Sequence, residues 1–453
     1  MYLLYSLLLT LGFLILLPRF FVDALRSGKY VTGLRQRLGN IPPLNRKGEP
    51  VIWLHCVSVG ETRAAQPLAN ALLERFPSLT LVVSTTTVTG QQVARDIFRN
   101  QAAAIFYFPI DWAWTVRRTL RVIQPAAVLL METELWPNVL RECHRREIPV
   151  SLVNGRISKT SFRRYAKIKH FIKRVLTDLT FAAMQSREDA ERIRELGLTD
   201  DRIIVTGNLK FDSAATSSDE QLTEEIRQRF QFDAKRALIV AASTHAPEEA
   251  IIFVAFKRAR LSHPNARLLI APRHPERFEE VASLLKTTGF SFTLRSKSPS
   301  APEAECDVIL LDTIGELRAV YPLADIVFVG GSVTPHGGQN MLEPAAYGIC
   351  TVTGPHTSNF AAITKALLEE NALIQTSAVS PEEATTELAD IFTRLLNDDE
   401  ARRRIGRRAK SVCHRNQGAT EQTLGLISQI LSAPATTDHE VLSFSTLPAT
   451  TSK

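Results

Sequence analysis

Charged side chains follow short apolar runs at several points in the first half of the chain. Glu61, Glu132, Glu134 and Lys210 each stand within a few residues of the end of such a run. Glu132 and Glu134 are two residues apart, so they would share one face if the strand continued. Carboxylates placed this way can transfer protons, and a lysine can stabilise negative charge. A single acid here is more typical of a helix N-terminus, but several at one sheet edge favour a functional site.

A glycine-rich segment, residues 325–348, carries a second group of candidate residues. Its apolar run 326–329 has the length and β-branched content of a strand, and it ends in two glycines and a serine. Residues 340–347 predict a helix with Asn340 as N-cap and Glu343 at the capping-box position. Because glycines admit a ligand close to the backbone and helix N-termini favour anions, we expect a nucleotide or phosphate site. An ordinary glycine-rich turn is the alternative, since neither common nucleotide-binding glycine pattern is present.

Other residues of the second half also follow apolar runs, among them Ser243 and Arg273. Arg273 could hold a phosphate with two hydrogen bonds, or form a surface ion pair with Glu276 or Glu279. Glu343 could bind a ribose diol or cap the helix backbone. The histidines show no metal-ligand spacing, so we predict no metal site.

An alternation of apolar runs and amphipathic segments positions these residues. It is the pattern of a doubly wound parallel sheet, in which ligands bind beyond the carboxyl ends of the strands. The pattern occurs twice, so we expect an α/β protein with two Rossmann-like domains facing a cleft. The predicted strands are 51–57, 79–83, 104–108, 126–131, 150–153, 181–184 and 203–205, then 238–242, 266–270, 308–311, 326–329, 351–353 and 373–375.

Shifts in composition mark the domain boundaries. Residues 212–225 are polar and fit an interdomain linker, and the chain after Ser432 is rich in threonine and serine without periodicity. The predicted organisation is a membrane anchor at 1–22, a first domain at 35–211, the linker at 212–225, a second domain at 226–431 and a disordered tail at 432–453.

The N-terminus predicts an uncleaved membrane anchor. Residues 1–18 carry no charged side chain and are rich in leucine, and Arg19, Arg26 and Lys29 follow. The apolar run approaches the ~20 residues of a membrane span, and the positive charge behind it belongs on the cytoplasmic side. No basic residue precedes the run and no small-residue cleavage site follows it. A buried or interfacial helix is the alternative.

The composition fits a folded enzyme with an anionic partner. The 453 residues are 45% hydrophobic and 22% charged, with a formal net charge of +7. That charge is compatible with nucleic acid, a membrane surface or a phosphorylated substrate. The five cysteines are scattered, which indicates neither a disulfide framework nor a zinc site.

A strongly basic stretch at 156–174 predicts a helix that faces phosphates. Its cations include Arg156, Lys159, Arg163 and Arg164, with aromatic residues between them. Such a helix suits a membrane surface or a phosphorylated lipid. A solvated helix face is the alternative, and no recognised motif supports nucleic-acid binding.

Several motifs occur together and in order, and they resemble the 3-deoxy-D-manno-octulosonic acid (Kdo) transferase family, whose members have the GT-B fold. The similarity extends from the N-terminus to about residue 431. The motifs are 58–61 (SVGE), 131–138 (METELWPN), 154–156 (NGR), 207–212 (GNLKFD), 271–277 (APRHPER), 312–317 (DTIGEL) and 328–332 (FVGGS).

The resemblance implies roles for individual residues. Glu61 matches the catalytic base, and Glu132 and Lys210 match positions that support the transition state. The acceptor or the membrane would contact Arg156, Lys159, Arg163 and Arg164. The residues expected to bind CMP are Pro272, Arg273, Ile314, Gly315, Glu316, Gly331, Ser332, Asn340, Met341, Leu342 and Glu343.

The resemblance further implies the reaction and its location. It implies inverting transfer of Kdo from CMP-Kdo to a lipid A precursor in lipopolysaccharide synthesis, with no metal and no cofactor. The enzyme would work at the cytoplasmic face of the inner membrane and bind its anionic surface. The alternatives are another GT-B sugar-nucleotide enzyme, such as a hexosaminyl transferase or an epimerase, and a non-catalytic nucleotide-binding membrane protein.

Overall fold

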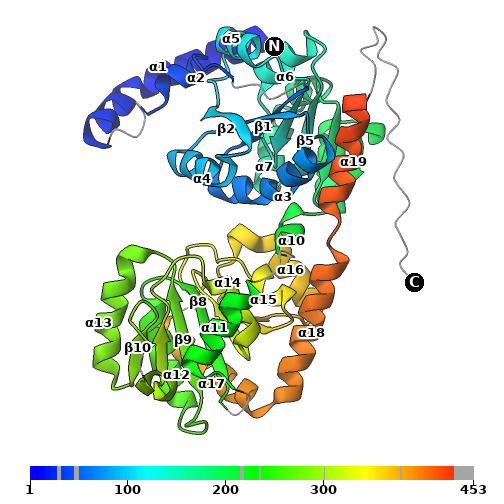
Figure 1. Cartoon of the computed structure of the whole chain (residues 1–453). Helices are drawn as coiled ribbons and strands as arrows, with labels where there is room; N and C mark the ends of the chain where they lie inside the picture. The colour runs from blue at the N-terminus through cyan, green and yellow to red at the C-terminus, as the bar shows by residue number, and fades with distance from the viewer. Residues whose placement is uncertain are drawn as a thin grey trace. The chain divides into compact units, whose positions relative to one another are not determined.

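Two compact units make up the chain. The structure, a computed structural model, describes residues 1–27, 32–44, 50–214, 219–233, 236–299, 301–377 and 380–432. Unit 1 comprises Met1–Ser213 and Gln417–Lys453, and unit 2 comprises Ala214–Asn416. Each unit contains a parallel sheet covered by helices on both faces (Figure 1). The predicted doubly wound α/β architecture is therefore confirmed in both halves.

The sheet of unit 1 has, within the described residues, seven parallel strands in the order β3-β2-β1-β4-β5-β6-β7. The chain builds outward from β1 on one side and then continues from β4 on the other. The carboxyl ends of β1 and β4 are therefore the topological switch point, where open α/β sheets bind ligands. The strands are β1 (Val51–Cys56), β2 (Thr80–Thr85), β3 (Ala102–Tyr107), β4 (Ala127–Met131), β5 (Val150–Gly155), β6 (Phe181–Met184) and β7 (Ile203–Val205).

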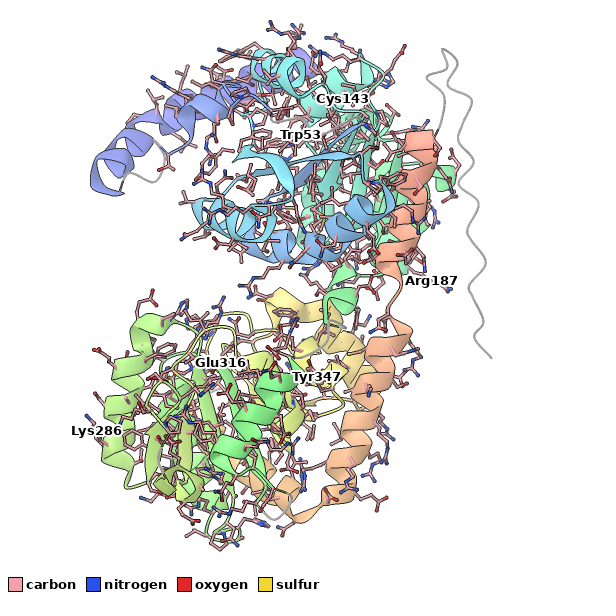
Figure 2. The ribbon with its side chains drawn as sticks, in the orientation of Figure 1. Trp53, Cys143, Arg187, Lys286, Glu316 and Tyr347 are labelled. Carbon is pink, nitrogen blue, oxygen red and sulfur yellow. The ribbon has the colours of Figure 1, made fainter. Side chains whose placement is uncertain are left out.

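Helices bury both faces of this sheet, which explains why its central strands are continuous apolar runs. On one face Trp53 packs with Phe106 and Phe108 in the interior of unit 1 (Figure 2), and its Nε1 donates a 2.8 Å hydrogen bond to Ser84. That face is covered by α5 (Ala113–Ile123), α6 (Pro137–His144), α8 (Lys169–Leu176) and α9 (Arg187–Leu196). The other face is covered by α3 (Val59–Arg75), α4 (Val88–Phe98) and α19 (Ala419–Ser432). Smaller elements are α2 (Leu34–Arg37), α7 (Lys159–Ala166), η1 (Asp200–Arg202) and α10 (Leu209–Ala214).

The last described helix, α19, belongs to unit 1, whereas the sequence placed it in the second domain. It lies beside α3 (Figure 1), and Leu424 and Ile427 are buried in the core of unit 1. Asp212 accepts hydrogen bonds from the backbone N–H groups of Gly418 and Thr420, at 2.8 and 2.6 Å. A carboxylate at this position satisfies N–H groups that the first turn of a helix leaves unpaired.

The sheet of unit 2 has seven described parallel strands in the order β10-β11-β9-β8-β12-β13-β14, with its switch point between β8 and β12. The strands are β8 (Leu238–Thr244), β9 (Arg267–Pro272), β10 (Phe292–Leu294), β11 (Val308–Leu310), β12 (Ile326–Val329), β13 (Cys350–Thr353) and β14 (Ile374–Gln375). The helices are α11 (Glu220–Phe230), α12 (Glu248–Ala259), α13 (Phe278–Thr288), α14 (Leu317–Val320), α15 (Leu342–Ala346), α16 (Ala361–Glu369), α17 (Pro381–Asn397) and α18 (Asp399–Arg415), with 3₁₀ turns η2 (Pro275–Arg277), η3 (Ala301–Glu305), η4 (Tyr321–Leu323) and η5 (Ser358–Phe360).

Two boundary predictions differ from the structure. Helix α11 begins at Glu220, inside the predicted linker 212–225, and residues 215–218 of that linker lie outside the described part of the chain. The basic stretch at 156–174 forms two short helices, α7 and α8, instead of one. The predicted tail lies outside the described residues after Ser432.

Helix α1 (Tyr2–Ser27) is held on unit 1 by its tyrosines. The hydroxyl of Tyr2 donates to Asp178 at 2.8 Å, and the hydroxyl of Tyr5 donates to Asp111 at 3.0 Å. Most of the described leucines of α1 are exposed: Leu3, Leu4, Leu7, Leu8, Leu11, Leu14, Leu16 and Leu17. The membrane-spanning anchor predicted at 1–22 is not found, because no helix among the described residues combines the length and the apolar character needed to cross a bilayer.

Candidate functional site

Glu61 lies at the N-terminus of α3, directly after β1. Ser58 is the N-cap of this helix, and its hydroxyl donates a 2.9 Å hydrogen bond to Glu61 Oε1. The backbone N–H of Val57 donates to Glu61 Oε2 at 2.7 Å. A serine N-cap with a glutamate three residues later is a capping-box arrangement, and it fixes the carboxylate in one position. Glu61 is only 8% exposed.

Burial and two other acids change the protonation of Glu61. Burial, then the charge of Glu132 and to a lesser extent that of Glu134, together raise the pKa of Glu61 to about 8, against the lowering effect of the hydrogen bonds from Val57 and Ser58. Burial, followed by the charge of Glu132, raises the pKa of Glu134 to about 7. An acid whose pKa lies near neutral pH can both accept and release a proton, as general acid–base catalysis requires.

Glu132 follows β4 across the switch point from Glu61, and its carboxylate lies 3.5 Å from the ammonium of Lys210. Its backbone has φ of 55°, a left-handed conformation that is costly for a glutamate. The bond from the Glu132 N–H to the carbonyl of Val153, at 3.0 Å, helps to hold this conformation. Backbone strain of this kind is concentrated at functional sites.

Side-chain amides connect the strand ends around these charges. Asn154, with φ of 53°, accepts the backbone N–H of Leu209 on its side-chain oxygen at 3.0 Å. Gln185 donates to the Asn154 carbonyl and accepts from Asn208, at 2.9 and 3.1 Å. The side chain of Asn208 in turn accepts the N–H of Lys210 at 3.0 Å. This network fixes the backbone that carries Lys210 relative to β5 and β6.

The predicted acceptor contacts lie in the same unit as the acids. Arg156 directly follows β5, and its carbonyl accepts a hydrogen bond from Thr133, between Glu132 and Glu134. Lys159, Arg163 and Arg164 are exposed on α7. The structure therefore brings Glu61, Glu132, Lys210 and Arg156 to one edge of the unit 1 sheet, with the cations of α7 on the next helix.

In unit 2 the glycine-rich turn after β12 is held by one buried carboxylate. Glu248 Oε2 accepts the backbone N–H groups of His245 and Gly331 at 3.0 and 2.7 Å, and its Oε1 accepts those of Ser332 and Val333 at 2.8 and 2.9 Å. A Cβ on Gly330 would come within 2.8 Å of the Glu248 carboxylate and the Ser243 carbonyl. The sequence assigned Gly331 and Ser332 to CMP binding, but their backbone N–H groups already have an acceptor in Glu248.

The role of Glu248 was missed in the sequence, although a signal exists. That signal is an acid three residues after His245: Glu248 is the first residue of α12 and accepts the His245 N–H. The contacts to Gly331, Ser332 and Val333 connect β8 with β12, which are neighbours in the sheet but distant in the sequence. Only the sheet order brings them together.

The other predicted nucleotide-binding residues lie at the same carboxyl edge of the unit 2 sheet. Pro272 ends β9, and the N–H of Arg273 donates to the Thr244 carbonyl at 2.9 Å. Glu316 (labelled in Figure 2) accepts two hydrogen bonds from Arg295, at 2.9 and 3.1 Å, and one from Thr313. Ile314 is 79% exposed beside Gly315, which has φ of 90°.

The helix predicted at 340–347 is shorter than expected. It begins at Leu342, and the side chain of Asn340 accepts the Leu342 N–H at 3.1 Å and donates to Glu343 at 3.2 Å. Glu343 also lies 3.5 Å from Arg318. The side chains of Met341 and Leu342 are fully buried, so a ligand could meet only their backbone.

Comparison with known proteins first establishes the class. The MurG protein of Acinetobacter baumannii has a crystal structure that matches 84% of this chain and 100% of its own, with a TM-score of 0.53 at 13% sequence identity. At that identity the likeness concerns the fold alone, and with the two doubly wound units it places the chain in the GT-B class.

Sequence relatives then establish the family. The 3-deoxy-D-manno-octulosonic acid transferase of Haemophilus influenzae is 34% identical over 408 residues, which cover 90% of this chain and 93% of the relative. The enzyme of the same name from Bordetella pertussis is 34% identical over 388 residues, 84% and 87% of the two chains. A family model described as 3-deoxy-D-manno-octulosonic-acid transferase (kdotransferase) matches residues 32–213. The chain belongs to the Kdo transferase family and is a glycosyltransferase.

Proposed function

We propose that this enzyme moves Kdo from CMP-Kdo to a lipid A precursor, lipid IVA, in lipopolysaccharide synthesis. The transfer inverts the anomeric centre and needs no metal ion. The observation that carries the proposal is the geometry around Glu61. Val57 and Ser58 hold the Glu61 carboxylate, which supplies a general base at the end of β1. The ion pair of Glu132 and Lys210 supplies one negative and one positive charge at the same sheet edge.

The proposed step is a single displacement. Glu61 takes the proton from the acceptor hydroxyl as the hydroxyl oxygen forms a bond to the anomeric carbon of Kdo. The bond from that carbon to the CMP phosphate breaks, and its electron pair leaves with the phosphate. Attack opposite to the leaving group inverts the configuration. The carboxylate of Glu132 stabilises positive charge that develops on the sugar, and Lys210 stabilises negative charge.

The donor is assigned to unit 2 because the predicted CMP residues share one edge of its sheet. Arg273 supplies positive charge for the phosphate, which supports transfer without a metal. Glu343 and Asn340 offer oxygen and amide groups for the ribose and the base. The acceptor is assigned to unit 1, where Lys159, Arg163 and Arg164 offer cations to phosphate groups of a lipid.

We place the enzyme at the cytoplasmic face of the inner membrane through an interfacial helix. Tyr2 and Tyr5 hold α1 on unit 1, while Leu3 is 88% exposed and Ile15 is 76% exposed. A helix with an exposed apolar side can bind within the headgroup region without spanning the bilayer. Such a location would bring the enzyme to a lipid acceptor.

The test combines transfer with binding. Detergent-solubilised protein is incubated with CMP-Kdo and tetraacylated lipid A precursor, with and without EDTA, and the lipid is analysed by mass spectrometry. A mass gain of one or more Kdo residues in both samples is expected. Glu61→Gln should abolish the gain and leave CMP binding intact, whereas Glu74→Gln, at an exposed position of the same helix, should transfer normally. Absence of transfer by the unaltered protein would overturn the proposal.

A further inference from the structure

Three histidines meet at the switch point of the unit 2 sheet, and no step described above uses them. His245 follows β8, His274 follows β9, and His336 lies in the loop after β12. The ring of His245 is 5.3 Å from that of His274 and 4.5 Å from that of His336, measured between centroids. Since β8 lies between β9 and β12, the three rings converge where a doubly wound sheet binds ligands.

The backbone around His245 fixes its ring so that Nδ1 faces the Ser243 carbonyl and Nε2 does not. Its N–H is fixed by Glu248, and its Nδ1 lies 3.2 Å from the Ser243 carbonyl, which defines Nδ1 as the protonated atom. Gly331 makes room for the ring, because a Cβ there would lie 3.3 Å from ring atoms of His245. Nε2 is left as the atom that can bind a ligand.

The charges around His245 are mainly positive. Burial is the largest cause that lowers the pKa of His245, and His336, His274 and Arg273 act in the same direction against the Ser243 carbonyl, so that the pKa is about 4. The oxygens of Glu248 accept four backbone N–H groups, and Glu249 is bound to Thr244 and Arg277. Basic groups that gather in this way repel one another until an anion binds between them.

A metal site does not explain this arrangement. In the part of the chain that the structure describes, no group of three His, Cys, Asp or Glu side chains is arranged to hold a metal ion. The Nδ1 of His336 is also bonded to Thr334 Oγ1 at 2.7 Å. The chemistry that fits is recognition of an anionic oxygen group by imidazole N–H donors.

We propose that His245, His274 and His336 form an anion site that binds an acidic group of the sugar nucleotide, either its phosphate or the carboxylate of its sugar. The inference rests on the proposed function, which places an acidic sugar nucleotide in unit 2. Anion binding draws a proton onto His245, because the negative charge offsets its basic neighbours. Donor binding is therefore coupled to proton uptake.

Kinetics and binding test the site with full-length protein. His245→Asn, and His336→Asn at an exposed position, are compared with His414→Asn, an exposed histidine of α18. We expect the two site variants to raise the KM for CMP-Kdo at least about tenfold and the control to leave it unchanged. A parallel loss of CMP affinity assigns the phosphate, and a raised KM with unchanged CMP affinity assigns the carboxylate. Normal KM and normal CMP affinity in both site variants overturn the proposal.

A spectroscopic readout separates this proposal from the proposed function. The ring signals of His245 are followed by NMR over a pH series, without and with saturating CMP, and again with inorganic phosphate. We expect an anion that binds the site to raise the pKa of His245. If the unaltered protein binds CMP but transfers no Kdo, the proposed function fails, and weakened CMP binding by the His245 and His336 variants still supports the anion site. In that case, unchanged CMP binding by both variants would overturn the proposed anion site.

Discussion

The ammonium of Lys210 lies 3.5 Å from the carboxylate of Glu132, and the two side chains are 19% and 18% exposed. The lysine is thus the cation that balances the acids at the end of β1 and β4. Removing it should raise the pKa of Glu61 further, because the charge of Glu132 would no longer be offset. We expect Lys210→Met to lower kcat about 100-fold and to move the acidic limb of the pH–rate profile upward. Lys286→Met, on α13 of unit 2 (Figure 2), is the control and should leave both unchanged.

The protonation of Glu61 predicts the pH dependence of transfer. With its pKa raised to about 8, Glu61 is mostly protonated at neutral pH and gains base function as the pH rises. We expect kcat/KM to rise with pH and to level off above about pH 8. Initial rates over a pH series at low CMP-Kdo concentration provide the measurement. A profile that stays flat across this range would contradict the assignment of Glu61 as the base.

The same acid links stability to pH. A folded-state pKa of about 8, against an ordinary value of 4.5, means that the folded protein binds an extra proton between these values. The stabilisation that Glu61 contributes through this proton is at its maximum below pH 4.5, and it is lost as the pH rises through about 8. Glu61→Gln removes this loss, so the variant should gain about 4 kcal/mol over the parent protein between pH 4.5 and pH 8.5. Denaturant titrations at both pH values provide the measurement. If the difference in unfolding free energy between the variant and the parent protein were the same at both, Glu61 would not be buried as described.

Glu248 predicts a link between stability and donor binding in unit 2. Both of its oxygens accept backbone N–H groups, so Glu248→Gln places an NH₂ group against two donors. We expect a loss of about 2–3 kcal/mol in unfolding free energy and weaker CMP binding, because the turn at Gly330–Ser332 loses its support. Calorimetry of unfolding and of CMP binding measures both. Glu400→Gln, at an exposed position of α18, should change neither.

The exposed side of α1 predicts membrane binding. Replacing Leu3, Leu7 and Ile15 by serine removes exposed apolar area while the tyrosine contacts to unit 1 remain. Each removed side chain contributes about 1–2 kcal/mol of transfer free energy, so the triple variant should bind vesicles at least about 100-fold more weakly. Flotation with anionic phospholipid vesicles measures the change. Leu261→Ser, 84% exposed in unit 2, is the control; equal loss in both would argue against a role for α1.

The fold class could be predicted from the chain because buried parallel strands leave continuous apolar runs separated by amphipathic helices. For the same reason the residues that follow strands, such as Glu61, Glu132 and Arg273, could be named in advance as candidates. The short helices were harder to place: α15 begins at Leu342 and its N-cap is Met341, so the prediction of Asn340 as N-cap was wrong, although the Asn340 side chain accepts the Leu342 N–H. Periodicity is weak over so few residues.

The sequence by itself determined the two α/β halves, the family motifs and the side chains that a sheet edge would present. Tertiary structure alone decided that α19 packs on unit 1, that Glu248 holds the turn after β12 and that three histidines converge beside it. It also decided that Glu61 is buried next to Glu132, which moves its pKa toward neutrality. These features depend on the order of strands in the sheets and on desolvation, and local sequence patterns encode neither.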